Sequence, residues 1–261
     1  MYVDSHCHLD FPEFAPELDA VLDRARAAGV GHFLTIGTGL ARFPAVRAIA
    51  ESAPDIHCTV GVHPHDAQNE PVDAELLLSE AVHPKVVGFG ETGLDYYYGH
   101  SPREAQIANF RSHIAAARQS GLPVVIHTRD AEDDTIEILE QEQKLGPFAG
   151  VIHCFTGTPR LAGAALEFGL YISVSGIATF KNSEMLRATV KEVPLNRLLI
   201  ETDCPYLAPQ PVRGKRNEPA FVIHTAAMLA QLNRITPAEL GQVTTDNFFR
   251  LFSRAAPVRA S

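Results

Sequence analysis

Eight short apolar runs alternate with helix-like segments along this chain. They are rich in aliphatic and β-branched residues, and they lie near Tyr2–His8, His32–Thr38, Ile56–Val62, Val86–Glu91, Pro123–His127, Gly150–Phe155, Leu170–Ser175 and Leu198–Asp203. Continuous apolar runs of this length are typical of strands that are buried on both faces of a parallel sheet. The alternation therefore predicts eight parallel strands that are joined by crossover helices.

Two connecting segments show the helical pattern clearly. Residues Glu17–Ala28 and Glu104–Ser120 place apolar side chains three and four positions apart, which is the spacing of one helical face. Gly29 and Gly121 directly follow these segments, and glycine commonly follows the last turn of a helix. We expect both segments to be helices that pack on the sheet.

Eight strand–helix units close into a (β/α)8 TIM barrel, and 261 residues is a typical length for that fold. The alternative is an open, doubly wound α/β sheet. No glycine-rich dinucleotide-binding motif follows the first strand, which weakens that alternative. The sequence also shows no internal repeat, low-complexity tract or domain linker, so we expect residues 1–261 to form one barrel domain.

The composition is that of a folded, acidic protein. Hydrophobic residues make up 46% of the chain and charged residues only 20%, which argues against disorder. The formal net charge is −9, so the chain does not bind nucleic acid through a broad basic surface. If the substrate is a phosphodiester, bound cations and a few local basic residues have to hold it.

Nothing in the sequence indicates export or insertion into a membrane. The N-terminus lacks a basic segment followed by an apolar one, and no uncharged run approaches the length of a membrane span. The four cysteines, Cys7, Cys58, Cys154 and Cys204, form no C-x-x-C pair. We expect a cytoplasmic protein with reduced thiols, and we infer no obligate protein partner.

Side chains that can bind a metal lie at the ends of five predicted strands. His6 and His8 share a face of the first strand because side chains alternate along a strand, and Cys7 then points toward the helices. The carboxyl ends of barrel strands meet at one mouth. Six side chains are therefore expected to converge there: His6, His8, Glu91, His127, His153 and Asp203.

This convergence predicts a metal centre. Any single histidine at a strand end is more often a structural residue, but a set of buried polar side chains without a cation lacks partners. Imidazole and carboxylate suit zinc, manganese, iron or similar divalent ions. A single catalytic ion commonly has three protein ligands, so six candidates favour two ions, and Glu91 can bridge them.

Other charged or titratable residues near the strand ends each have a functional and a structural interpretation. His63 can orient substrate or donate a proton, or it can be a structural histidine of the turn with Pro64. Arg129 follows the fifth strand and can face a phosphate or a loop carboxylate. TIM barrels often bind phosphate with late loops, although a basic loop can also be a solvated surface. Three basic residues follow the eighth strand: Arg213, Lys215 and Arg216.

The strand-end residues belong to short motifs that run through nearly the whole chain. The motifs are DSHCHLD from Asp4, GVHPH from Gly61, GETGLDY from Gly90, HTRDA from His127, HCFTG from His153, ETDCPYL from Glu201, RGKRNEPA from Arg213 and TDNF from Thr245. Each motif alone is weak. Together and in this order they resemble the TatD family of metal-dependent deoxyribonucleases, within the wider amidohydrolase-type barrels.

The resemblance implies a hydrolase that acts on DNA ends as a 3′ to 5′ exonuclease and uses magnesium, manganese or zinc. Single-stranded DNA or DNA ends would then be its substrate. Some members of the family lack the paired histidines on the first strand, and this chain resembles the branch that has them. The metal-ligand positions of the family match His6, His8, Glu91, His127, His153 and Asp203.

We expect hydrolysis by a water molecule that two divalent ions activate. Glu91 bridges the ions, and Asp203 accepts the proton of the attacking water. The basic loop would help to hold the strand. The remaining ligands divide between the two ions in this way: His6, His8 and Asp203 for one ion, and His127 and His153 for the other.

Two other functions stay open at this point. The same type of barrel hydrolyses small amides, esters or lactones, and the negative net charge favours such substrates. Those enzymes often use a carboxylated lysine as the bridging ligand, whereas here Glu91 ends the corresponding strand. The third function is a non-enzymatic metal-binding module, but closed structural sites favour four ligands without an open position.

Overall fold

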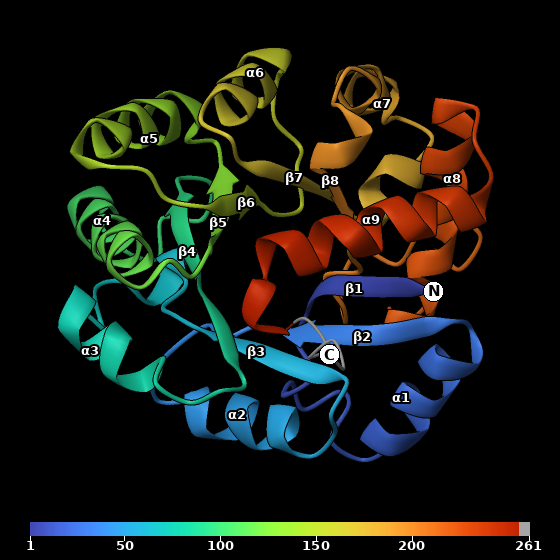
Figure 1. Cartoon of the computed structure of the whole chain (residues 1–261), viewed down its shortest axis with the longest axis horizontal. Helices are drawn as coiled ribbons and strands as arrows, with labels where there is room; N and C mark the ends of the chain where they lie inside the picture. The colour runs from blue at the N-terminus through green and yellow to red at the C-terminus, as the bar shows by residue number, and fades with distance from the viewer. Residues whose placement is uncertain (256–261) are drawn as a thin grey trace, which may run out of the picture.

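The computed structural model describes residues 1–255 and shows one sheet of eight parallel strands in sequence order (Figure 1). Each strand pairs in parallel with the next along the chain. The expected (β/α)8 barrel is confirmed. The strands are β1 Tyr2–Cys7, β2 Val30–Thr35, β3 Ile56–Val60, β4 Val86–Asp95, β5 Val124–Arg129, β6 Gly150–Ile152, β7 Tyr171–Val174 and β8 Leu198–Ile200.

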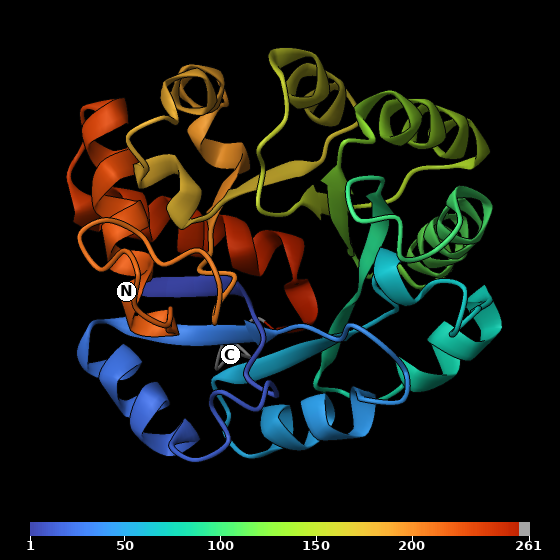
Figure 2. The same ribbon diagram turned by 180° about the vertical axis from the view of Figure 1, so that it is seen from behind.

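Helices surround the strands on the outside (Figures 1 and 2). Among the described helices, none combines the length and the apolar character that a membrane crossing requires. The helices of the outer ring are α1 Leu18–Ala27, α2 Phe43–Glu51, α3 Ala74–Glu80, α4 Arg103–Ser120, α5 Glu132–Leu145, α6 Pro159–Glu167, α7 Glu184–Lys191 and α8 Val222–Asn233.

The two helices that the sequence predicts are confirmed within one residue at each end. Helix α1 begins after Glu17, and the chain then reverses at Gly29, whose φ of 92° lies in the left-handed region. Helix α4 ends at Gly121, which has a φ of 75°. A side chain with a Cβ rarely adopts these angles, so glycine lets the chain leave the helix sharply toward the next strand.

The seam between the first and last strands closes beyond the regular ends of both. The amide of Asp203 donates to the carbonyl of His6 at 2.9 Å, and the amide of His8 donates to the carbonyl of Cys204 at 3.0 Å. Lower down, the Ser5 hydroxyl donates to the carbonyl of Ile200 at 2.9 Å. These bonds fix the two histidines of β1 beside Asp203.

The alternation of side chains along β1 is interrupted between Asp4 and Cys7, where the pairing with β2 shifts its register. Val3 packs inside the barrel, whereas Cys7, four residues later, packs between the strands and the outer helices, as the sequence predicts for Cys7. The Cys7 thiol donates to the carbonyl of Leu34 at 3.3 Å, and all four cysteines are free thiols. His6 and His8, one residue to either side of Cys7, therefore point into the barrel mouth.

A ninth helix, α9 Pro237–Leu251, covers the amino-terminal end of the barrel. It lies in front of the strands in Figure 1 and behind them in Figure 2. A capping box between Thr236 and Glu239 begins the helix. At its end, the buried side chains of Phe248, Leu251 and the following Phe252 pack against inward-facing residues of the strands. This apolar plug leaves only the opposite end of the barrel open for chemistry.

We expect Phe248→Ala to lower the free energy of unfolding by about 3–5 kcal/mol, because Phe248 is fully buried and its removal leaves a cavity. Phe249→Ala is the matched control, since its ring is only partly buried beside the same cluster, and it should cost about 1–2 kcal/mol. Urea unfolding of the protein in a chelator measures both. Equal losses in the two variants would show that α9 does not plug the barrel.

Candidate metal centre

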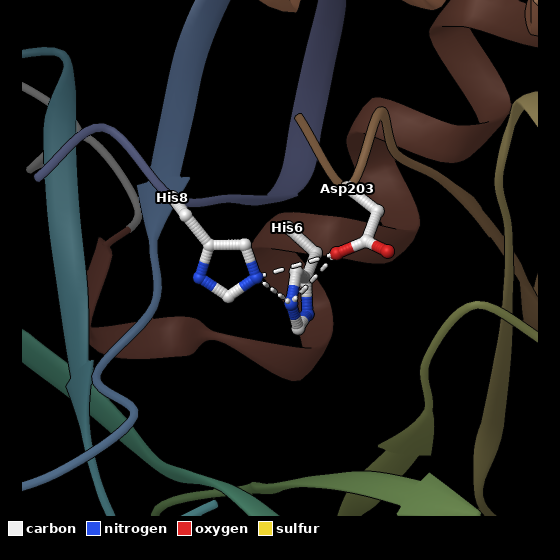
Figure 3. Close-up of side chains that lie close together, drawn as sticks. All are labelled: His6, His8 and Asp203. Carbon is white, nitrogen blue, oxygen red and sulfur yellow. Dashed lines mark hydrogen bonds and ion pairs between the residues drawn. The ribbon is translucent and has the colours of Figure 1, made fainter. Parts of the chain in front are cut away.

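Three side chains from the seam of the barrel point toward one another (Figure 3). The Nε2 atoms of His6 and His8 lie 3.3 Å apart. Asp203 Oδ1 lies 3.6 Å from the first nitrogen and 3.3 Å from the second. All three side chains are largely buried, and their ligand atoms lie close enough together to hold one ion.

Glu91 lies at the centre of the site and divides its two carboxylate oxygens between two groups of histidines. Oε2 lies 3.3 Å from Nε2 of His6 and 3.9 Å from Nε2 of His8. Oε1 lies 2.7 Å from Nε2 of His153 and 3.0 Å from Nδ1 of His127. One oxygen thus faces each pair of imidazoles, which is the arrangement that a carboxylate bridging two ions requires.

His63 joins the second group. Its Nε2 lies 3.4 Å from Glu91 Oε1, and together with Glu91 and His127 it forms a set whose ligand atoms can hold an ion. The amide of His65 donates to Nδ1 of His63 at 3.1 Å. Because Nδ1 accepts a hydrogen, a neutral His63 carries its proton on Nε2. His63 therefore faces the site as a hydrogen-bond donor.

Close packing of glycines brings Glu91 to the centre of the mouth. A Cβ on Gly61 would lie 2.5 Å from the Cα of Gly90, so the backbones of β3 and β4 can meet here only without side chains. Gly90 has a φ of 125°, and the amide of Glu91 donates to the carbonyl of Gly37 at 2.7 Å, reaching past β3. These contacts fix the backbone of Glu91 beside the segment that follows β2.

The residues present fit divalent ions. Two imidazole nitrogens that face each other at 3.3 Å repel unless a proton or a cation lies between them, and this occurs in both histidine pairs. Burial by itself would raise the pKa of Glu91, but the interactions of its two oxygens with the surrounding histidines hold it well below its usual value. Four neutral ring nitrogens around two ionised carboxylates form a nitrogen and oxygen donor set that zinc or manganese accepts.

Asp95 is a member of the site that the sequence analysis missed. Its Oδ2 lies 3.1 Å from Nε2 of His127 and 3.0 Å from Nε2 of His65. A carboxylate on the rear nitrogen of a metal-facing histidine fixes the ring and its tautomer. The strand was expected to end at Glu91, whereas β4 continues to Asp95. A signal was available, because Asp95 is four residues after Glu91 and side chains two or four apart share a strand face.

Glu201 and Asp4 are two further buried carboxylates behind the ligands. Glu201 Oε1 accepts from the amide of Cys154 at 2.6 Å and lies 3.4 Å from Nδ1 of His153. Asp4 accepts from the amide and the hydroxyl of Thr202. Burial raises the pKa of Asp4 to about 8, although both bonds from Thr202 oppose that change. Together they hold the loops that carry the ligands of β6 and β8.

A cavity of about 680 Å³ opens onto the ligands at the mouth of the barrel. The predicted Arg129 lies in its wall, and so does Arg42, which the sequence analysis did not single out. Two tyrosines and a phenylalanine complete the rim: Phe11, Tyr98 and Tyr206. These positions give no sequence signal of their own, because the loops bring them together only in the folded barrel.

Among the described residues, 1–255, those that line the cavity do not include the basic residues of the loop after β8. Arg213 lies over the ring of Phe180, with its guanidinium carbon 3.7 Å from the ring centroid. Arg216 pairs with Glu17 at 2.7 Å and so ties the loop to the start of α1. Lys215 is exposed. Contact of Arg213, Lys215 or Arg216 with a substrate stays a prediction.

A barrel whose open end collects imidazoles and carboxylates around a central glutamate defines the class of metal-dependent hydrolases. The sequence model of the family described as TatD related DNase matches residues 3–253, so the chain belongs to this family. The resemblance seen in the motifs is thereby confirmed.

Known relatives agree with this assignment. The chain is 46% identical to the uncharacterized metal-dependent hydrolase YcfH of Escherichia coli K12, over 96% of this chain and 95% of that protein. It is 37% identical to the 3′-5′ ssDNA/RNA exonuclease TatD of Musicola paradisiaca, over 95% of this chain and 97% of that protein. The crystal structure of YJJV, a TatD homologue from Escherichia coli K12, superposes with a TM-score of 0.89 at 29% identity, over 98% of both chains.

We expect Asp95→Asn to weaken metal binding about 10- to 100-fold, because His127 would lose the carboxylate that fixes its ring. Competition with a fluorescent chelator measures the affinity. Asp19→Asn, on the exposed face of α1, is the control and should bind metal like the wild type. Unchanged metal affinity in Asp95→Asn would contradict the role of Asp95.

Proposed function

We propose that this metal-dependent hydrolase is a nuclease that removes nucleotides from the unpaired 3′ ends of DNA with two divalent ions. The main support for hydrolysis with two ions is the position of Glu91 between two groups of histidines. The relative in Musicola paradisiaca, named a 3′-5′ ssDNA/RNA exonuclease, supports the choice of substrate. The arginines in the cavity wall supply positive charge for its phosphates.

Each ion would bind the group of ligands that faces one of the two carboxylate oxygens of Glu91. When bound, magnesium, manganese or zinc would make a water molecule acidic near neutral pH and offset charge on the phosphoryl oxygens. Glu91 would contribute one oxygen to each ion. The proposed sets are His6, His8 and Asp203 for one ion, and His127 and His153 for the other.

Asp203 and His63 are the proposed catalytic residues of the chain itself. The Asp203 carboxylate lines the cavity and is the least buried of the ligands at the seam, so it can accept the proton of an attacking water. His63 presents the hydrogen on Nε2 to the same cavity. It can donate that hydrogen bond to a phosphoryl or leaving oxygen.

Positive charge for the substrate comes from a few residues only. Arg129 and Arg42 line the cavity and would contact phosphates next to the scissile bond. Arg213, Lys215 and Arg216 would contact the strand further out, beyond the cavity wall. Because the chain as a whole carries −9, these contacts have to be local.

Hydrolysis of a small amide, ester or lactone is the second candidate. The cavity of about 680 Å³ supports it, because sites for small molecules commonly have volumes of about 300–1,000 Å³. The same ligands and the same Asp203 would serve that reaction. A non-enzymatic role is not supported by an open cavity on the ligands.

We expect close to two divalent ions per chain after reconstitution with manganese or zinc. The reason is that Glu91 offers one oxygen to each of two histidine groups. Elemental analysis of the dialysed protein measures the number. His8→Asn, which removes a ligand from one group only, should bring the content toward one ion. A wild-type protein that holds no more than one ion would rule out the two-ion centre.

A substrate panel tests the nuclease proposal directly. The metal-loaded protein should shorten single-stranded oligonucleotides from the 3′ end much faster than it hydrolyses uncharged esters, amides or lactones. Asp203→Asn should lose about 100- to 10,000-fold of this activity, since it lacks the proposed base, and it also excludes a contaminating nuclease. Faster hydrolysis of a small ester than of any oligonucleotide would make the second candidate the function.

A further inference from the structure

Within residues 1–255, the strongly exposed aromatic side chains follow strand ends at the mouth of the barrel. Among residues 1–255, the strongly exposed large hydrophobic residues include three aromatic ones, which are Tyr97, Tyr98 and Tyr206, at 57%, 51% and 53% exposure. Tyr97 and Tyr98 lie just after the end of β4, and Tyr206 lies in the loop after β8. Scattered aliphatic residues on a surface need no explanation, but three tyrosines at the catalytic mouth suggest a ligand with flat faces.

The first aromatic group lies beside the paired histidines. Phe11 stacks on the ring of the metal-ligand candidate His8, with centroids 4.7 Å apart and planes 23° apart. Tyr206 meets Phe11 edge-on at 6.0 Å. The guanidinium of Arg42 lies 4.6 Å above Phe11 and is held by Asp10 at 2.7 Å. We name Phe11, Arg42 and Tyr206, which all line the cavity, the Phe11 platform.

The second group lies beside the other histidines. Tyr98 and His100 are stacked, with centroids 5.5 Å apart and planes 10° apart. The guanidinium of Arg129 lies 4.9 Å from the ring centroid of Tyr98 and 4.0 Å from that of Tyr97. We name Tyr98, His100 and Arg129, which all line the cavity, the Tyr98 platform.

The two platforms face each other across the ligands. The Phe11 platform comes from the loops after β1, β2 and β8, and the Tyr98 platform comes from the loops after β4 and β5. In a barrel with the strand order β1 to β8, these loops lie on opposite sides of the mouth. The central carboxylate of Glu91 lies between them. Each platform combines flat rings with one guanidinium.

We propose that the two platforms bind unpaired nucleotides on either side of the scissile bond. Bases would stack on the exposed rings of Tyr98 and Tyr206, which the other members of each platform hold in place, and Arg42 and Arg129 would contact the flanking phosphates, as in proteins that bind single strands by stacking. In a duplex the faces of a base are covered by its neighbours, so the platforms select an unpaired end. This inference rests on the proposed function and adds to it the residues that choose single strands.

The test compares ring removal with ring retention. The probe is a labelled short thymidine oligonucleotide with non-hydrolysable linkages, bound to the metal-loaded protein and followed by fluorescence anisotropy. Tyr98→Leu/Tyr206→Leu keeps apolar volume without a ring, and it should raise Kd about 5- to 150-fold for each stacked base. Tyr98→Phe/Tyr206→Phe keeps both rings and should restore the affinity.

A second arm uses the wild-type protein, so it does not depend on how a variant folds. The same oligonucleotide with abasic sites at its 3′ end keeps the phosphates but loses the bases, and it should bind more weakly by a similar factor. Two results would contradict the proposal that bases stack on the platforms. One is equal affinity for the abasic and the intact probe, and the other is wild-type affinity of the leucine variant with normal metal content. If the wild type neither binds nor shortens the intact strand, the nuclease proposal fails as well.

Discussion

The carboxylate of Glu91 is the constraint around which the mouth of this barrel is built. A buried carboxylate without partners is costly, and here both oxygens have imidazoles within 2.7–3.9 Å. Its place at the centre depends on the close contact between Gly61 and Gly90, which leaves no room for a side chain at Gly61. The two groups of ligands come from different strands and meet at this carboxylate, beside the ring of His6, which stacks on that of His153 with centroids 3.9 Å apart.

Charge explains why the surroundings of Glu91 favour bound cations. Carboxylates outnumber the permanent positive charges near the ligands, because Glu91, Asp95, Asp203 and Glu201 all lie within the same end of the barrel. Histidines can balance them only when they are protonated, and burial opposes that. Divalent cations remove this conflict, since neutral imidazoles and ionised carboxylates are then both favourable.

Strand direction and side-chain alternation made much of the site predictable from sequence. His6 and His8 had to share a face because β1 is a strand, and all parallel strands of a barrel present their carboxyl ends to one mouth. Asp95 was missed because the end of β4 was placed at Glu91, four residues early. The contact between Gly61 and Gly90 and the meeting of Arg42 with Phe11 depend on residues that lie far apart in the chain, so no local pattern reports them.

The proposed substrate is a polyanion, and an acidic protein cannot gain affinity for it from long-range attraction. A net charge of −9 repels a strand at a distance, so binding energy has to come from contacts made within the cavity. The arginines of the two platforms are held in place by Asp10 on one side and by tyrosine rings on the other. Stacking and metal ions act only at short range, and they are therefore suited to an unpaired end that enters the mouth. A duplex, which presents mainly phosphates, would meet the repulsion without gaining the stacking.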